Sequence, residues 1–249
     1  MDFLLLTAGV LGTIILIYLV LGLLVEVIVT RLPAHSEKTL GGFYSQFLGE
    51  GSPSKKQTYL QQIVDELTEV MPNSDRRFKV HVVKNKEPNA IALPGGNIVV
   101  FTPLIEEAES KEELTFVLAH ELGHYANKDH LRGFGRLLVL VTVATALSGG
   151  QGAFPDFLVN SLVNVEMKFS QQQERNADRF ALEMLHERYQ HVAGALDFLK
   201  RMASAENKGR MWYFFASHPY PQDRISTLEQ QIFTNRYETG QATRLPDDL

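Results

Sequence analysis

The stretch from Phe3 to Val25 contains no charged residue, and it restricts the fold more than any other part of the chain. It reads FLLLTAGVLGTIILIYLVLGLLV, so apolar side chains dominate and only glycines and a few hydroxyl groups interrupt them. At a rise of about 1.5 Å per residue, a helix of this length crosses a hydrocarbon core of about 30 Å. The segment therefore predicts that residues 1–28 anchor the chain in a membrane through a single spanning helix.

A cleaved signal peptide is the alternative reading of this segment. Asp2 rather than a basic cluster precedes the apolar run, the run is longer than the core of a signal peptide, and no A-x-A site follows it. These features favour an anchor that is retained. Basic residues follow the span but do not precede it, so the positive-inside rule places the rest of the chain on the cytoplasmic side. They are Arg31, Lys38, Lys55 and Lys56.

Residues 29–51 are predicted to be a linker, because RLPAHSEKTLGG is polar and carries a proline and paired glycines. A folded domain is expected at residues 52–235, with a C-terminal tail at residues 236–249. The first helix of this domain is predicted to begin at Ser52-Pro53, with proline in the first helical position, and to stop at Pro72. Apolar residues mark one face of it: Leu60, Ile63, Val64, Leu67 and Met71.

A small sheet is predicted after this helix. RFKVHVV alternates like a strand, and NAIALPGGNIVVFT reads as two short strands around a Pro-Gly-Gly-Asn turn. Ser110 and Glu113 form a capping-box pattern, which predicts a helix from about Lys111 to about Asn127. A further helix is expected over Ser170–Tyr189.

The run LLVLVTVATAL, Leu137 to Leu147, admits two readings. It is strongly apolar but only about half as long as a membrane span. A helix buried in the core is the favoured interpretation. A second segment that enters the membrane or lies at its interface is the alternative, and Arg132 and Arg136 just before the run would suit an interfacial position.

The sequence HELGH, His120 to His124, lies in one of the predicted helices. Because residues four apart share a helix face, His120 and His124 can present two imidazoles to one metal ion. Zinc suits these ligands, and Glu121 is placed to act as the base that takes a proton from a zinc-bound water during attack on a peptide carbonyl. An exposed helix with two solvated histidines is the alternative for this motif alone.

The sequence ERNAD offers a third metal ligand. Glu174 and Asp178 are four apart on a predicted helix, so Glu174 can be the carboxylate ligand and Asp178 can accept the outer N–H of a ligating histidine. Ordinary surface ion pairs are the alternative. They are harder to accept because apolar residues lie beside these charges: Ala177, Ala181 and Leu182.

Composition limits the kind of site and the partners. The chain has no cysteine, so disulfides and a thiolate zinc site are excluded, and a metal would need imidazole and carboxylate ligands. The formal net charge is -5, with acidic and basic residues well mixed and no basic stripe. Nucleic acid is therefore not expected as a partner.

Four blocks, NAIALPGG, HELGH, ERNAD and SHPYPQDR, occur in the order seen in one family. Over about Ser52 to Gln231 the chain resembles the HtpX-like membrane zinc metallopeptidases, which are related to type I CAAX prenyl proteases and to BepA- and OMA-type proteases. The resemblance implies an α+β, zincin-like (gluzincin) fold, with a mostly helical catalytic domain and a small β-sheet. It also implies endopeptidase action on membrane or misfolded proteins, with Glu121 as catalytic base. One zinc ion per chain would be held by His120, His124 and Glu174.

The resemblance gives a role in substrate binding to NAIALPGG, which is similar to the strand that lies at the edge of the active-site cleft in members of the family. An edge strand has free backbone groups that can pair with an extended polypeptide substrate. A plain hairpin is the alternative, and both readings can hold together. The residues concerned are Asn89, Ala90, Ile91 and Ala92.

The resemblance also gives a role to SHPYPQDR, which contains His218 and Arg224. Both are donors suited to the oxyanion that develops during water attack. In some relatives the matching histidine lies near the zinc, so His218 is also a candidate ligand of the resting site. For Arg224 the alternative is a structural ion pair with Asp223 or another acid.

The pattern departs from HtpX itself, in which two apolar spans precede the metal motif and further spans follow it. CAAX proteases have still more spans, which argues against prenylated substrates. The leading hypothesis is a membrane-anchored, zinc-dependent endopeptidase. The alternatives are a non-catalytic, zinc-stabilised membrane assembly or chaperone-like factor and a metal-dependent hydrolase of other bonds. The presence of Glu121 argues against the first, and the edge-strand block argues against the second. The oligomeric state is left open.

Overall fold

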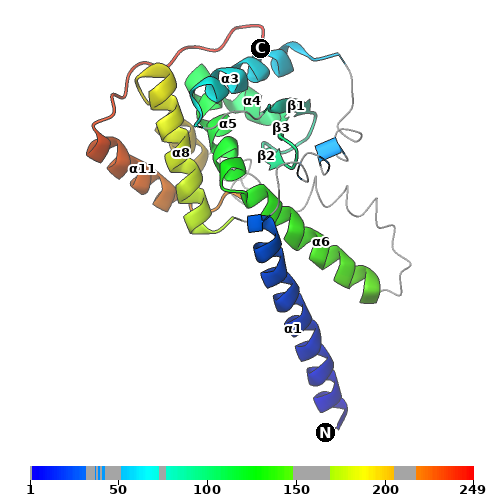
Figure 1. Ribbon diagram of the computed structural model, residues 1–249. Helices are drawn as coiled ribbons and strands as arrows, with labels where there is room; N and C mark the ends of the chain where they lie inside the picture. The colour runs from blue at the N-terminus through cyan, green and yellow to red at the C-terminus, as the bar shows by residue number, and fades with distance from the viewer. Residues whose placement is uncertain are drawn as a thin grey trace. The chain divides into compact units, whose positions relative to one another are not determined.

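A computed structural model describes residues 2–31, 37, 39, 41–42, 52–72, 77–147, 169–204 and 217–249. The chain divides into two compact units. The first consists of Met1–Pro33 and Leu131–Met167, and the second of Ala34–His130 and Lys168–Leu249. The second unit contains the sheet and most of the helices, as expected for a mostly helical α+β domain (Figure 1).

The first unit contains α1 (Asp2–Arg31) and nearly all of α6 (Asp129–Leu147). Among the described residues, α1 is the one helix long and apolar enough to cross a membrane, and it extends beyond residue 28. Glu26 Oε1 on α1 accepts a hydrogen bond of 2.8 Å from Arg132 Nε on α6. The two helices also approach closely at Gly135, where an added Cβ would lie 2.5 Å from Val25 Cγ1.

The apolar run Leu137–Leu147 is helical as the last part of α6, and its interpretation as a buried core helix stays a prediction. The core of the second unit includes none of its described residues. Leu137, at the start of the run, is buried within the described structure.

The sheet has three strands, β1 (Lys79–Val83), β2 (Ala90–Leu93) and β3 (Asn97–Phe101). Their order is β1-β3-β2, with β1 parallel and β2 antiparallel to β3. The predicted hairpin is thus confirmed, and its turn places Gly95 and Gly96 at φ values of +81° and +80°. Because β2 is an edge strand of this sheet, one side of its backbone is left free of strand pairing.

Helix α5 (Lys111–Ala126) forms the centre of the second unit and is buried from Glu112 to Tyr125. It lies between α8 (Gln171–Tyr189) and the sheet (Figure 1). The α5–α8 contact is close at Gly123, where an added Cβ would lie 2.9 Å from Ala177 Cα. The remaining helices of the unit are α3 (Lys55–Val70), α4 (Thr102–Glu107), α9 (Ala195–Ala203) and α11 (Pro221–Asn235).

One predicted helix start and one predicted capping box need correction. The helix expected to begin at Ser52-Pro53 begins at Lys55, because Ser54 is its N-cap and accepts a hydrogen bond from Gln57 N. At α5, Ser110 Oγ does accept from Glu113 N, but the Glu113 carboxylate accepts from Glu109 N and from Arg201. Of the two hydrogen bonds of a capping box, the one to the Ser110 side chain is therefore formed, whereas the Glu113 carboxylate bonds to Glu109 N instead of Ser110 N.

Residues of the predicted C-terminal tail contact the start of α5. The Glu112 carboxylate, which is buried, accepts hydrogen bonds from Thr243 N at 2.6 Å and from Thr243 Oγ1 at 2.8 Å. Lys111 N donates to Thr243 O. These contacts hold the terminal segment against the first turn of the central helix.

Stability is expected to depend on pH through His81 on β1, which is only 3% exposed and has Nε2 2.9 Å from Asn97 Oδ1. Burial lowers the pKa of His81 below its ordinary value of 6.5. Below about pH 6.5 the unfolded chain therefore binds a proton here that the folded chain does not, so the free energy of unfolding falls as the pH falls.

The variant His81→Gln should lack this contribution. The difference in free energy of unfolding between wild type and variant, measured by urea denaturation, should then shrink as the pH is lowered from about 8 to about 5. A difference that stays constant over this range would contradict the expectation.

Candidate metal and catalytic site

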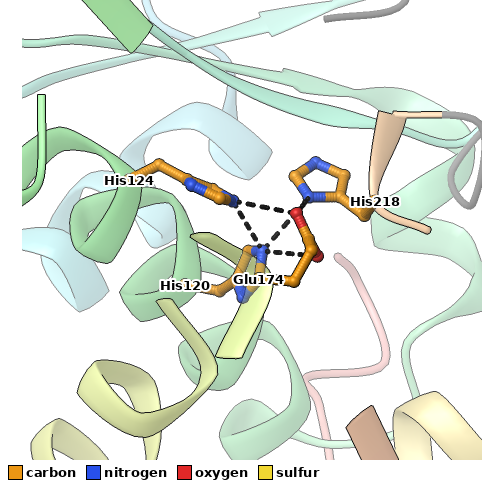
Figure 2. Close-up of side chains that lie close together, drawn as sticks. All are labelled: His120, His124, Glu174 and His218. Atoms are coloured by element: carbon orange, nitrogen blue, oxygen red, sulfur yellow. Dashed lines mark hydrogen bonds and ion pairs between the residues drawn. The ribbon is translucent and has the colours of Figure 1, made fainter. Parts of the chain in front are cut away.

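His120 and His124 lie one turn apart on α5, and both side chains are buried. Their Nε2 atoms are 3.1 Å apart. Helix α8 brings the buried Glu174 to the same point, with Oε1 3.3 Å from His124 Nε2 and Oε2 3.6 Å from His120 Nε2. The predicted ligand residues thus converge from two packed helices, and Figure 2 shows their side chains pointing toward one another.

His218 joins this group from the segment before α11. Its Nδ1 lies 3.1 Å from His120 Nε2 and 3.3 Å from Glu174 Oε1 (Figure 2). All four ligand atoms lie within 4.8 Å of one another, and all four residues are buried. His218 therefore lies where it could serve as a fourth ligand.

The hydrogen bonds on the far side of the imidazoles orient both rings for binding of a cation. His120 Nδ1 lies 2.8 Å from Asp178 Oδ1, and His124 Nδ1 lies 3.0 Å from Asp129 Oδ2. Because an ionised carboxylate can only accept, each Nδ1 carries its proton and a neutral ring turns an Nε2 lone pair toward the other ring. A divalent cation between the lone pairs and Glu174 would relieve this repulsion, so the residues fit a zinc-type site.

The electrostatic surroundings of the two imidazoles differ. Burial and the positive charge of Arg224 lower the pKa of His120 to about 3. Burial also acts against a charged His124, but hydrogen bonds to Asp129 and Glu174 outweigh it and raise the pKa to about 9. A raised pKa means that a metal ion and a proton would compete for His124 Nε2, so binding of a metal here should depend on pH.

Arg224 and Asp178 form a buried support behind His120. The guanidinium donates from Nε to Asp178 Oδ2 at 2.8 Å and from Nη2 to Oδ1 at 2.7 Å. Its Nη1 lies 2.8 Å from Glu174 Oε2 as an ion pair, although this oxygen accepts no hydrogen bond from the part of the chain that the structure describes. Burial opposes ionisation of both carboxyl groups, but Arg224 outweighs it and keeps the pKa of Glu174 and of Asp178 below their ordinary values.

The alternative predicted for Arg224 is a structural ion pair with Asp223 or another acid, and the structure shows such pairs with two other acids. Arg224 pairs with Asp178 and Glu174, whereas the Asp223 carboxylate accepts a hydrogen bond from Gln171. The guanidinium is only 1% exposed, so its direction is fixed by these two acids of α8.

Asp178→Asn is expected to lower the affinity for zinc by about 10–100-fold, the usual cost of removing a carboxylate that orients a ligating histidine. The change keeps the size of the side chain but removes the charge that holds both His120 and Arg224. Competition with a chromogenic chelator measures the affinity. Asp197→Asn on α9, where the side chain is exposed, is the matched control. Equal affinities in the two variants would contradict this role.

Sequence patterns did not assign a role at the metal site to two residues. Asp129, 2% exposed, orients His124 and also accepts a 2.7 Å hydrogen bond from Gln173 Nε2. A carboxylate shortly after the second histidine of HELGH was the available signal for Asp129. Phe169 stacks on the His124 ring with centroids 3.8 Å apart. Phe169 belongs to none of the sequence motifs, so no local pattern indicated its contact with His124.

Glu121 lies between the metal-ligand residues and the edge strand. Its Oε2 accepts a 2.9 Å hydrogen bond from Ala92 N on β2, and its Oε1 lies 3.5 Å from His218 Nε2. Burial raises the pKa of Glu121 above its ordinary value. At the other end of β2, Asn89 Oδ1 accepts from Ala90 N and lies 3.4 Å from Ser217 Oγ. The structure thus brings the predicted edge strand directly to the predicted base.

Comparison with known proteins agrees with this arrangement. The model of peptidase family M48 matches residues 54–232. The mitochondrial metalloendopeptidase OMA1 of Schizosaccharomyces pombe is 28% identical over 178 residues, which are 70% of this chain and 52% of the relative. The beta-barrel assembly-enhancing protease of Escherichia coli is 24% identical over 207 residues, 76% of this chain and 42% of the relative. The metalloprotease LoiP of Escherichia coli is 28% identical over 160 residues, 62% of each chain. The chain thus spans about half the length of the first two relatives.

Proposed function

The chain belongs to peptidase family M48, and from this premise we propose that it is a membrane-anchored, zinc-dependent endopeptidase that cleaves membrane or misfolded proteins. The observation that carries the proposal is the convergence of His120, His124 and Glu174 beside Glu121 and the edge strand β2. Two imidazoles and one carboxylate, with a further carboxylate alongside, are the groups that hydrolysis of a peptide bond by a zinc enzyme requires.

In this proposal His120, His124 and Glu174 hold one zinc ion per chain. When bound, zinc supplies a Lewis acid that polarises the peptide carbonyl and lowers the pKa of water. Imidazole and carboxylate ligands favour zinc over magnesium or calcium. Asp178 and Asp129 fix the orientation of the two rings, and Arg224 positions Asp178 and Glu174 rather than contacting the substrate.

Glu121 acts as the general base. It takes a proton from the attacking water and passes it to the leaving amine. Its raised pKa suits both steps, because the protonated form must persist long enough to act as an acid. The hydrogen bond from Ala92 N holds one carboxylate oxygen in place while the other points toward His218.

His218 has two roles in this proposal. At rest it lies beside His120 and Glu174, where it occupies the place of a fourth ligand. When a substrate displaces it, its imidazole can donate a hydrogen bond to the oxyanion that forms during attack. Residues 89–92 pair with the extended substrate through backbone groups on the edge that β3 leaves unpaired. The helix α1 anchors the chain, and the basic residues that follow it favour a cytoplasmic catalytic unit.

Purified full-length protein in detergent, loaded with zinc, provides the test. It should cleave unfolded casein at internal peptide bonds, and an added chelator should stop the cleavage. Because His218 can occupy the site at rest, His218→Ala is assayed in parallel. Zinc-loaded wild type and His218→Ala that both leave casein intact would contradict the proposal and favour the non-catalytic assembly factor.

A further inference from the structure

Two backbone N–H groups of β2 lie on the edge that β3 leaves unpaired. Phe101 N donates to Asn89 O, which fixes the alternation of the antiparallel pairing. The backbone groups of Ala90 and Ala92 consequently point away from β3. Both residues are buried, with 0% and 3% of their surface exposed. Because a buried N–H group needs an acceptor, the partners of these two groups decide what the edge can bind.

Side chains occupy both N–H groups. Asn89 Oδ1 accepts a 2.9 Å hydrogen bond from Ala90 N, and Glu121 Oε2 accepts one of the same length from Ala92 N. The second acceptor is the proposed general base. A polypeptide strand that pairs along this edge offers its backbone carbonyls to the same two N–H groups. The side chains therefore hold positions that a substrate would need.

Glu121 and a substrate carbonyl compete for Ala92 N, because a backbone N–H group is a single donor. We propose that Glu121 holds the place of a substrate carbonyl at Ala92 N, and that pairing of an extended polypeptide with β2 releases Glu121 Oε2. This exchange of acceptors at Ala92 N rests on the proposed function. It adds the event that frees the base, so that a bound polypeptide strand is required before Glu121 is fully available.

The same two side chains contact the segment that carries His218. Ser217 Oγ lies 3.4 Å from Asn89 Oδ1, and His218 Nε2 lies 3.5 Å from Glu121 Oε1. Asn89 and Glu121 thus connect β2 to the residue that a substrate displaces in the proposed function. Pairing with β2 and displacement of His218 are expected to occur together, since both change the partners of these side chains.

Two variants without a base distinguish this exchange from a permanent contact. Glu121→Gln keeps an oxygen that can accept from Ala92 N, whereas Glu121→Ala removes the acceptor, and both are uncharged at this position. An unstructured casein-derived peptide labelled with fluorescein is titrated against each full-length, zinc-loaded protein, and fluorescence anisotropy measures its affinity. Glu121→Ala should bind the peptide about 3–10-fold more tightly, the net effect of one hydrogen bond, because no side chain competes for Ala92 N.

Ala92→Pro, added to both variants, removes the contested N–H group and should abolish the difference between them. Proline is compatible with this position because β2 is an edge strand and the N–H group points away from β3. Ala90→Pro is the matched control, since it removes the N–H group held by Asn89, and the difference should remain. Equal affinities of Glu121→Gln and Glu121→Ala, or a difference that survives Ala92→Pro, would overturn the inference.

Modified peptides test the exchange without a change in β2. In each peptide of the set, one backbone carbonyl is reduced to a methylene group. The peptide that lacks the carbonyl opposite Ala92 should bind Glu121→Gln and Glu121→Ala equally, whereas the others should keep the difference. A difference that persists in every peptide would overturn the inference, even if Ala92→Pro fails to fold.

Casein hydrolysis by the wild type and by His218→Ala is scored separately. Cleavage of casein together with equal peptide binding by the two Glu121 variants would overturn the exchange alone. Tighter binding by Glu121→Ala without any hydrolysis by the wild type or His218→Ala would support the exchange and contradict the proposed function.

Discussion

Glu121→Gln is expected to lower the rate of peptide hydrolysis by about 10²–10⁴-fold while zinc remains bound, because the amide cannot accept a proton from water. The substitution should not lower the stability of the fold. Burial raises the pKa of Glu121, so its carboxylate is less favourable in the folded chain than in water, and none of the described residues forms a hydrogen bond to Glu121 Oε1. The melting temperature of the variant should therefore equal or exceed that of the wild type.

Turnover of a quenched fluorescent peptide and the zinc content of the purified protein measure the two quantities. Glu69→Gln on α3 makes the same chemical change at an exposed position and should keep full activity. A Glu121→Gln protein that hydrolyses peptides at more than a tenth of the wild-type rate would exclude Glu121 as the base. Loss of zinc from this variant would instead assign the side chain to metal binding.

Glu174→Gln is expected to lower the affinity for zinc by more than about 100-fold. Removing a partner that only orients a ligand costs about 10–100-fold, and Glu174 is proposed as a ligand itself. The amide also removes the negative charge that, with Asp178, balances Arg224 in a fully buried position. A lower melting temperature of the metal-free protein should accompany the loss of affinity.

Zinc titration against a chelator of known affinity gives the first quantity, and thermal unfolding of the metal-free protein gives the second. Glu183→Gln lies on the same helix at an exposed position and should change neither. Zinc that stays bound at wild-type affinity in Glu174→Gln would require another third ligand. His218, which already lies within reach of the same point, would be the first candidate.

The parts of the fold that local patterns predicted are those with strong local causes. The Pro-Gly-Gly-Asn turn defines the β2–β3 hairpin because Gly95 and Gly96 need positive φ values. The spacing in HELGH and ERNAD placed the metal-ligand residues on single helix faces, and helix packing then brought the two faces together. Helix ends were less accurate, since the choice between Ser52 and Ser54 as the cap of α3 depends on one hydrogen bond.

The features that escaped prediction depend on partners distant in the chain. Arg224 finds its acids on α8, which nothing near Arg224 in sequence indicates. Residues 29–51 read as a linker because they are polar and rich in glycine, yet Glu37 and Gly41 contact the catalytic unit. A glycine that permits a backbone contact and a glycine that loosens a linker look the same in a sequence.

The contact between Gly123 and Ala177 changes how the HELGH motif should be written. In the general pattern H-E-x-x-H, the two positions after the glutamate can be any residue. Here the second of them, Gly123, is restricted by its contact with α8. A larger residue at position 123 would push α8 outward and carry Glu174 away from both imidazoles. In sites of this architecture, glycine at position 123 is thus a requirement of the packing of the two helices that carry the ligands.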